Sequence, residues 1–401
     1  MSPLFLILLF LISPFFSMVA SFWMLFKRKM AKGGVSICLV VISMFWGILA
    51  FSQKSLAVED TDCIRYYLSM ELYETLSITE SFQNINFLEL LNFIFYPVSV
   101  IAISTTGNVQ IVSFLWTFIV YILTYISIRR LMEYYGIFNQ KNLAKVILVC
   151  TFCFMAFVQI SELLKNSAAF AVFFYALTLY MTSGRKIYTM ILVLIAIGLH
   201  PSVIMLIPLF LYKVLNTKFI IVLSIVLFFI SLLTNIIELV LSILPNSGYF
   251  ELLLDRFEDY GDGKTGTTHY RAIQLALLCF ALYLWYKYKS NKDISYATNL
   301  VLLYFIISNI NFYNLVAYLR FSIFSHWLFA LIYIWYIRVS LESKNIRTIK
   351  KLIVVFMLIM TTRWTLGRTI SGGYCSSYMD NSLPKIIFST SYNYFSVDYE
   401  K

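Results

Sequence analysis

The chain has 401 residues, of which 60% are hydrophobic and only 13% are charged, and its formal net charge is +11. A soluble domain carries about twice that charged fraction, so the composition excludes a soluble enzyme, a coiled coil and a disordered chain. Six cysteines are too few for a secreted disulfide scaffold. Apolar runs of about 20 residues recur throughout, which predicts an all-α polytopic membrane protein.

The first apolar run covers residues 3–26 and is followed by Lys27, Arg28, Lys29 and Lys32. Because strongly basic loops stay in the cytoplasm, we expect a retained first helix with its N-terminus outside. Together with this helix, the other candidates give about ten full spans, with boundaries that are approximate. They lie near 35–51, 109–128, 143–160, 163–182, 219–245, 271–287, 297–313, 315–337 and 352–367.

The connecting loops differ in charge. Residues 52–86 hold six acids against two bases, and residues 246–270 hold five acids against two bases. The positive-inside rule therefore places these two long loops outside, together with a C-terminal tail at 368–401. We expect one integral membrane domain over residues 1–401. The basic loops that define the inner side are 27–34, 129–145, 183–186, 213–218, 287–298 and 338–351.

Two apolar stretches fit half-depth elements better than full spans. If residues 87–108 crossed the membrane, Arg129 and Arg130 would lie outside, so this stretch is predicted to be re-entrant or interfacial on the outer side. Residues 187–212 form two short pieces that are broken at His200-Pro201, because proline disfavours helix in the residue before it. Irregular backbone at membrane depth requires surrounding protein or a wet cavity, so the break predicts a cavity.

Several charged residues fall at or within the predicted outer ends of helices. Such charges cost a few kcal/mol unless they face a cavity and find partners, and outer bases oppose the orientation rule. Arginine binds two phosphate oxygens at once, so the group predicts an anionic ligand, although a single arginine there also fits snorkelling. The residues are Arg65, Glu162, Lys165, Glu238, Arg271, Arg320, Arg363 and Arg368.

The remaining candidate groups carry less information. His200 either caps the helix break or works in a site, whereas His326 and the pair Cys150 and Cys153 lie in apolar helices and fit buried packing. The sequence shows no metal-ligand set, no serine nucleophile motif and no dinucleotide glycine pattern. We therefore expect no metal and no cofactor.

Four stretches in order give the chain a family resemblance. They are EDTDCIRYY at 59–67, LLKNSAAF at 163–170, IAIGLHPSVI at 195–204 and YLRFS at 318–322. They resemble, respectively, the T-D-x-x-x-Y segment, the R-Q-x-(I/L)-A helix start, the A-x-x-x-H-x-(S/T)-(A/G) break and the late-helix arginine of the EpsG/Wzy-type polysaccharide polymerase family. The second stretch departs from the pattern, since Lys165 replaces arginine and Asn166 replaces glutamine. The agreement covers most of residues 35–340.

This resemblance implies a fold like that of the C-type glycosyltransferases and a multi-pass protein in the plasma membrane of a bacterium. It implies that a growing glycan is transferred from undecaprenyl pyrophosphate to the next lipid-linked repeat unit on the outer face. The product would be O-antigen, capsule or exopolysaccharide. The implied partners are the lipid-linked donor and acceptor, membrane lipid and a chain-length regulator, with no nucleic acid.

The resemblance and the residue chemistry together suggest roles. Arg320 and Arg271 would bind pyrophosphate, with Lys165 behind them. His200 or Asp62 would act on the acceptor hydroxyl, since an unperturbed imidazole titrates near pH 6.5, and Glu162 is a further carboxylate. Tyrosine rings would stack on sugars or simply pack on the surface. These are Tyr66, Tyr67 and Tyr249.

Three other classes of membrane protein remain alternatives. A lipid-linked oligosaccharide flippase would favour regular full spans and short loops, and an integral-membrane acyltransferase would use a cytoplasmic acyl donor. A secondary transporter would show broken helices in both halves of the chain, whereas the sequence shows one clear break, at His200. The long acidic loops and the broken hairpin favour the polymerase.

Overall fold

The computed structural model describes residues 3–27, 30–55, 62–85, 92–233, 291–311, 315–340, 376–379 and 382–397, together with part of 275–288. The chain divides into two compact units. The first comprises Met1–Val203 and Tyr336–Lys401, and the second comprises Ile204–Trp335. We describe each unit by itself. The prediction of a single membrane domain stays a prediction.

Within the described residues, five helices are long and apolar enough to cross a membrane. They confirm predicted helices near 35–51, 109–128, 163–182, 297–313 and 315–337. The predicted helix near 352–367 and the acidic loop 246–270 lie outside the described residues. The five helices are α3 (Lys32–Phe51), α8 (Ile111–Tyr134), α11 (Leu164–Ser183), α17 (Lys292–Ile310) and the stretch Arg320–Arg338 of α18 (Leu315–Ser340).

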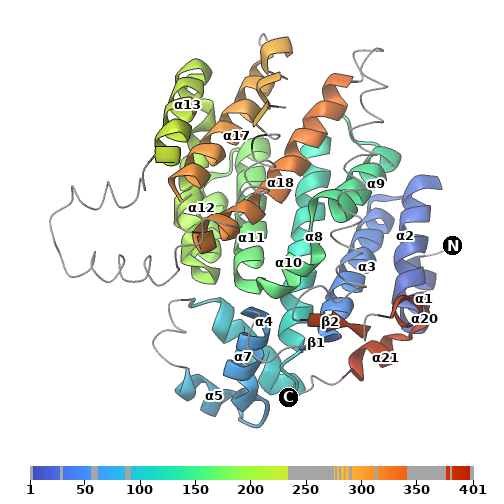
Figure 1. Ribbon diagram of the computed structural model, residues 1–401. Helices are drawn as coiled ribbons and strands as arrows, with labels where there is room; N and C mark the ends of the chain where they lie inside the picture. The colour runs from blue at the N-terminus through green and yellow to red at the C-terminus, as the bar shows by residue number, and fades with distance from the viewer. Residues whose placement is uncertain are drawn as a thin grey trace, which may run out of the picture. The chain divides into compact units, whose positions relative to one another are not determined.

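The first unit is built on a row of helices that pack side by side in the order α2 (Pro14–Lys27), α3, α8, α11 and α12 (Lys186–Leu199) (Figure 1). Helices α3 and α8 approach closely at Gly47, where an added Cβ would lie 3.0 Å from the Phe114 carbonyl oxygen. Next to this contact the Trp46 and Tyr121 rings stack at 5.3 Å. The shorter elements of the first unit pack against this row of helices.

The first apolar run is not one helix. It forms α1 (Pro3–Ile12) and α2, which meet at Ser13. The hydroxyl of Ser17 donates to the Leu6 carbonyl over 2.7 Å, whereas residues eleven apart in a straight helix lie about 16 Å apart. The chain therefore bends sharply, because Pro14 has no N–H to donate to Phe10. The prediction of a single helix over 3–26 is wrong.

The C-terminal tail is fastened to this bend. The Ser391 hydroxyl donates to the Phe10 carbonyl over 2.6 Å, which satisfies the acceptor that Pro14 cannot reach. Strand β1 (Gln53–Ser55), just after α3, pairs antiparallel with β2 (Ser376–Tyr378). The start of the acidic loop 52–86 and the tail thus lie at the same end of α3. The tail continues as α20 (Leu383–Phe388) and α21 (Ser391–Phe395).

The predicted span at 143–160 is also broken. It consists of α9 (Gln140–Val149), a π-helical turn η2 (Cys150–Phe154) and α10 (Phe157–Glu162). The Met155 N–H donates to the Cys150 carbonyl five residues earlier, over 2.8 Å, which closes the wide turn. Cys150 and Cys153 are free and buried, in agreement with a packing role.

The two predicted half-depth stretches form short elements. Helix α7 (Phe95–Thr106) is about 18 Å long by its residue count and ends at Gly107, which has a φ of +65°. Helix α12 ends at Leu199, His200 is extended with φ −156° and ψ 121°, and a 3₁₀ segment η3 (Pro201–Lys213) follows. The break therefore falls at the predicted residue. Their depth in the membrane stays a prediction.

The acidic loop 52–86 is largely helical where it is described. It holds α4 (Asp62–Met70), η1 (Glu71–Glu74) and α5 (Ile78–Asn84). Ser77 and Glu80 form a capping box at the start of α5. The Glu74 carboxylate accepts a 2.7 Å hydrogen bond from the Val109 N–H, just before α8. This bond fastens the loop to the end of the row.

The second unit contains most of η3, helix α13 (Thr217–Leu233), α17 and most of α18. Phe228 of α13 stacks on Phe305 of α17 with ring centroids 5.9 Å apart. The Asn299 amide donates to the carbonyls of Tyr212 and Leu215, over 2.8 and 2.9 Å, and so caps the end of η3. The apolar core of this unit includes Ile220, Leu278, Leu302, Phe305 and Ile306.

Candidate functional site

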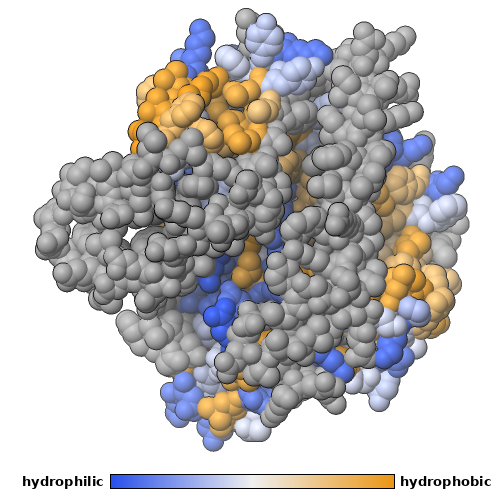
Figure 2. Space-filling view, in the orientation of Figure 1, coloured by the Kyte–Doolittle hydropathy of each residue, from blue (hydrophilic) through white to orange (hydrophobic). Residues whose placement is uncertain are grey.

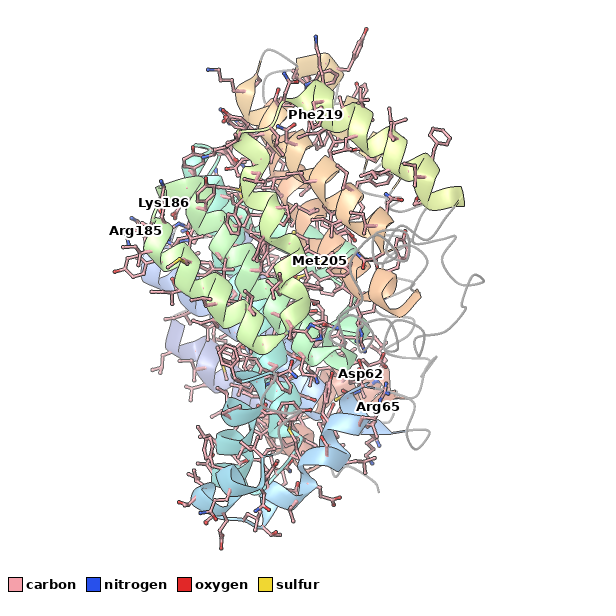
Figure 3. The ribbon with its side chains drawn as sticks, turned by 90° about the vertical axis from the view of Figure 1, so that its left-hand side faces the viewer. Asp62, Arg65, Arg185, Lys186, Met205 and Phe219 are labelled. Carbon is pink, nitrogen blue, oxygen red and sulfur yellow. The ribbon has the colours of Figure 1, made fainter. Side chains whose placement is uncertain are left out.

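Four elements of the first unit bring predicted site residues together. Helix α4 carries Asp62, Arg65 and Tyr66, and the α10–α11 junction carries Glu162 and Lys165. The start of α7 carries aromatic rings, and His200 follows the end of α12. Arg185 and Lys186, at the other end of α12, lie well away from Asp62 and Arg65 (Figure 3). The assembled residues therefore lie at the end of the unit that bears the acidic loop.

Lys165 lies against three aromatic rings. Its ammonium nitrogen is 4.7 Å from the ring centroid of Tyr66, 5.2 Å from that of Tyr96 and 5.9 Å from that of Phe95. The rings come from α4 and α7, while the lysine belongs to α11. The contact between Lys165 and this aromatic box (Tyr66, Phe95 and Tyr96) therefore joins three separate segments. Each cation–π contact contributes about 0.5–1 kcal/mol at an exposed site and more when desolvated.

The box is itself firmly held. Phe95 is fully buried and stacks on Trp116 of α8 at 5.2 Å, while Tyr66 and Tyr96 are 9% and 8% exposed. Leu163, with φ −101° and ψ 53°, separates α10 from α11 and places Lys165 in the first turn of α11. A cation is thus held in a mostly apolar setting, where its electrostatic interactions are stronger than in water.

His200 is connected to the box through the backbone. The Ile94 N–H donates to the Gly198 carbonyl over 3.0 Å, and Ile94 precedes the box residue Phe95. A Cβ at Gly198 would lie 2.6 Å from Cζ of Phe93 and 2.8 Å from Cδ1 of Ile94. Glycine therefore lets the end of α12 lie this close to the start of α7 without displacing the side chains of Phe93 and Ile94.

The hydrogen bonds of His200 indicate its tautomer. Nδ1 lies 2.7 Å from the Ser202 hydroxyl and accepts a 3.2 Å hydrogen bond from the Ser202 N–H. Because a backbone N–H can only donate, Nδ1 is the acceptor and the neutral ring carries its proton on Nε2. In this tautomer Nε2 is a donor, and the predicted action of His200 on the acceptor hydroxyl stays a prediction.

On α4, the Arg65 guanidinium donates to the Asp62 carboxylate over 2.5 Å. The Arg65 side chain is 61% exposed and that of Asp62 is 12% exposed, so this ion pair has one solvated partner and one mostly buried partner (Figure 3). A pair with one solvated partner contributes little to stability, about 0–1 kcal/mol. It orients the Asp62 carboxylate at the first turn of α4.

Tyr67 does not offer a ring to a sugar. It is 0% exposed, its hydroxyl bonds to the Ser113 hydroxyl, and Cys63 lies 3.2 Å from the same hydroxyl. Burial raises the pKa of the Cys63 thiol to about 12 and raises the pKa of Tyr67 well above its ordinary value. The stacking prediction for Tyr67 is wrong in this structure, and its side chain instead fastens α4 to α8.

Tyr378, from the C-terminal tail, belongs to the same neighbourhood and was not predicted. Its hydroxyl lies 2.6 Å from that of Ser161, beside Glu162, and its ring packs on Phe157 at 5.0 Å. Burial, followed by the charge of Glu162, raises the pKa of Tyr378. No local signal marks this residue, because its partner lies 217 residues away in sequence.

The predicted arginine cluster stays a prediction. Arg320 lies in the second unit, half-buried in α18, and its helix begins at Leu315, so it is about 8 Å from the helix start. Within the described residues no three His, Cys, Asp or Glu side chains come together to hold a metal. Five predicted residues lie outside the described ones: Arg271, Glu238, Arg363, Arg368 and Tyr249.

Comparison with known proteins gives one family. No curated protein and no solved structure matches the chain. The profile of the EpsG family matches residues 37–378, a stretch that includes α4, α7, α11, α12 and the strand that ends at Tyr378. The match covers most of the sequence and every element of the candidate site. The chain belongs to the EpsG family.

Proposed function

We propose that the protein is a glycosyltransferase that polymerises lipid-linked oligosaccharide repeat units. Membership of the EpsG family supports a polysaccharide polymerase in general. The observation that carries the finer proposal is the aromatic box, which holds the ammonium of Lys165 beside the segment that ends at His200. A caged cation next to a hydrogen-bond donor suits a pyrophosphate leaving group.

The proposed reaction transfers the growing glycan from undecaprenyl pyrophosphate to the next repeat unit. A hydroxyl oxygen of the acceptor sugar forms a bond to the anomeric carbon of the donor. The bond from that carbon to the pyrophosphate oxygen breaks, and the pyrophosphate keeps the electron pair. The hydroxyl proton passes to a carboxylate.

Lys165 is proposed to bind the pyrophosphate. Negative charge grows on this group as the glycosidic bond breaks, and a cation that is already in place stabilises it without reorganisation. The rings of the box restrict the lysine side chain, so less entropy is lost when the phosphate binds. The sequence assigns Arg320 and Arg271 to the same pyrophosphate, with Arg65, Arg363, Arg368 and Glu238 as further substrate-binding residues, and these assignments stay predictions.

His200 is proposed to donate from Nε2 to an oxygen of the leaving group. The Ser202 contacts at Nδ1 fix this tautomer, which cannot accept the acceptor's proton at Nε2. Asp62 or Glu162 is proposed to take that proton. Both carboxylates contribute, after burial, to the raised pKa of the Cys63 thiol, which is consistent with their being in one neighbourhood. Tyr66 and Tyr96 supply ring edges beside the sugar.

The proposed setting is the outer face of a bacterial plasma membrane. The acidic loop and the C-terminal tail lie at the same end of α3 as the site, and the positive-inside rule assigns that end to the outside. The product is O-antigen, capsule or exopolysaccharide, and a chain-length regulator is the expected protein partner.

The decisive experiment uses cells that lack the protein. They should accumulate a single repeat unit on its lipid carrier at the outer face, or on the lipid A core, and produce no long glycan. Re-expression of the wild-type chain should restore the polymer. If no outer-face unit appears, the protein is a flippase, and if full-length glycan remains without acyl groups, it is an acyltransferase.

A further inference from the structure

A pocket of about 380 Å³ lies in the second unit, where η3 ends and α13 begins. Residues 215–218 form one wall, Ser295, Tyr296 and Asn299 of α17 form another, and Trp285 completes it. None of these residues takes part in the proposed polymerase site. The surrounding loops, 213–218 and 287–298, are those that the positive-inside rule assigns to the inner side.

The wall contributed by α17 contains a buried amide oxygen in need of a donor. Asn299 is 1% exposed, and its Nδ2 donates to the carbonyls of Tyr212 and Leu215. The amide cannot flip, because Oδ1 would then face two carbonyl oxygens. Within the described residues Oδ1 has no hydrogen-bond partner, and Asn299 lines the pocket. A ligand with an N–H or O–H group would satisfy it.

The opposite wall favours an anion. It contains the first turn of α13, a helix of 17 residues, and the exposed Lys218. Asn216 caps this turn by accepting from the Lys218 N–H over 2.9 Å. The positive end of a helix and a lysine together form a site for a phosphate group.

The rim of the pocket continues into an apolar surface. Directly after Lys218, α13 exposes Phe219 and Val222, each 61% exposed, and apolar side chains gather over this helix (Figure 2). Trp285 and Tyr296 line the pocket, and such rings are enriched where a membrane protein meets the headgroups. A molecule with its polar part in the pocket would therefore have its apolar part along α13.

We propose that this pocket binds a phospholipid whose headgroup carries a hydrogen-bond donor. The phosphate diester lies at Lys218 and the start of α13, the headgroup donates to Oδ1 of Asn299, and an acyl chain lies along Phe219 and Val222. Phosphatidylethanolamine supplies an ammonium donor and phosphatidylglycerol a hydroxyl donor. Phosphatidylcholine has the same phosphate but no donor.

The test uses the purified full-length chain, delipidated in detergent and titrated with these three lipids of identical acyl chains, with native mass spectrometry as the readout. Phosphatidylethanolamine, phosphatidylglycerol or both should bind roughly tenfold more tightly than phosphatidylcholine, since the latter leaves the buried oxygen unsatisfied. Preference for phosphatidylethanolamine would identify an ammonium as the donor to Asn299, and preference for phosphatidylglycerol would identify a hydroxyl. Equal binding of all three lipids overturns the proposal.

Matched lysine variants locate the site. Lys218→Gln should weaken binding of the preferred lipid roughly fivefold, whereas Lys292→Gln, at an exposed lysine that does not line the pocket, should leave it unchanged. Equal effects of the two substitutions would overturn the assignment. Should Lys218→Gln not fold, the headgroup series on the wild-type chain decides the matter by itself.

Discussion

The backbone N–H of Ile94 donates a 3.0 Å hydrogen bond to the carbonyl oxygen of Gly198. This bond joins the start of α7 to the end of α12, two short elements that neither helical continuity nor sequence proximity would bring together. It sets where His200 lies with respect to the aromatic box. A side chain at position 198 would meet the side chains of Phe93 and Ile94, and this leads to the first prediction.

Gly198→Val should destabilise the protein by about 1–3 kcal/mol and reduce polymer synthesis, because its side chain would overlap Phe93 and Ile94. Phe93 is 54% exposed, so the second substitution Phe93→Ala should restore part of the loss by clearing that space. Gly33→Ala is the control, since no atom lies within 4 Å of its added Cβ. The measurements are the thermal unfolding midpoint in detergent and glycan length in complemented cells. An unaffected Gly198→Val variant would refute the contact.

Substitutions of Lys165 test whether its ammonium group, which lies against the aromatic box, binds the pyrophosphate. Lys165→Met keeps the length of the side chain and removes its charge, so polymer synthesis should fall about 100-fold or more. Lys165→Arg keeps the charge, stacks on the same rings and matches the arginine of the family pattern, so it should retain activity. Both variants should insert and accumulate like the wild type. If the methionine variant polymerises normally, Lys165 does not bind the pyrophosphate.

Substitutions of His200 distinguish a role as a hydrogen-bond donor from a role as a base. His200→Ala should abolish the polymer while leaving the protein abundant, as should Arg320→Ala. The amide of His200→Gln places an N–H near the position of Nε2, so this variant should keep part of the activity, whereas His200→Asn should not. If His200 instead acts as a base, all three substitutions should reduce the polymerisation rate equally, because none of the new side chains can accept the proton. The readout is initial polymerisation rate at matched protein level.

The tail contact at the α1–α2 bend is open to a stability test. Ser391→Ala leaves the buried Phe10 carbonyl without a donor and should lower the free energy of unfolding by about 1–3 kcal/mol. Ser396→Ala is the matched control, because in the part of the chain that the structure describes this exposed hydroxyl bonds locally, to the Asn393 carbonyl. The control should unfold within about 0.5 kcal/mol of the wild type. Equal midpoints for both variants would contradict the docking of the tail.

Cysteine labelling tests the orientation. In a chain without the native cysteines, a membrane-impermeant maleimide should label Thr79→Cys in intact cells and Lys186→Cys only after permeabilisation, since both positions are exposed and lie in loops of opposite predicted side. Restored Cys63 should stay unlabelled at pH 7–8, because the thiolate is the reactive form and burial raises the pKa of this thiol to about 12. The reverse labelling pattern would invert the topology.

Some of this architecture could be read from local chemistry. The break at His200 was predictable, because proline restricts the residue before it and both flanking pieces are short. The bend at Ser13 had the same signal in Pro14, but the uniform apolar composition of residues 3–26 concealed it. The π-helical break at 150–154 contains no glycine or proline, so it depends on tertiary packing that the sequence does not display.

The candidate site was predictable only in part, because some of its residues are brought there by tertiary packing. Lys165, His200, Asp62 and Tyr66 stood out because they lie in the stretches that resemble the family pattern, and because a charge such as that of Lys165 is unusual in an apolar helix. Phe95 and Tyr96 look like ordinary apolar residues of a short helix, and their role depends on which segment they face. Tyr378 reaches the site only through the pairing of two strands that are distant in sequence.

Strand β1 finds its partner 325 positions further along the chain, where Gln53 pairs with Tyr378. During synthesis, the helices of the row are made before β2, so they can pack while β1 is still unpaired. The entropy cost of closing such a loop grows only slowly with its length, so the late synthesis of β2, more than the length of the loop, sets when the pair can form. The contact between the Tyr378 and Ser161 hydroxyls therefore cannot form until synthesis has passed residue 378, so a chain truncated before that residue lacks this part of the candidate site.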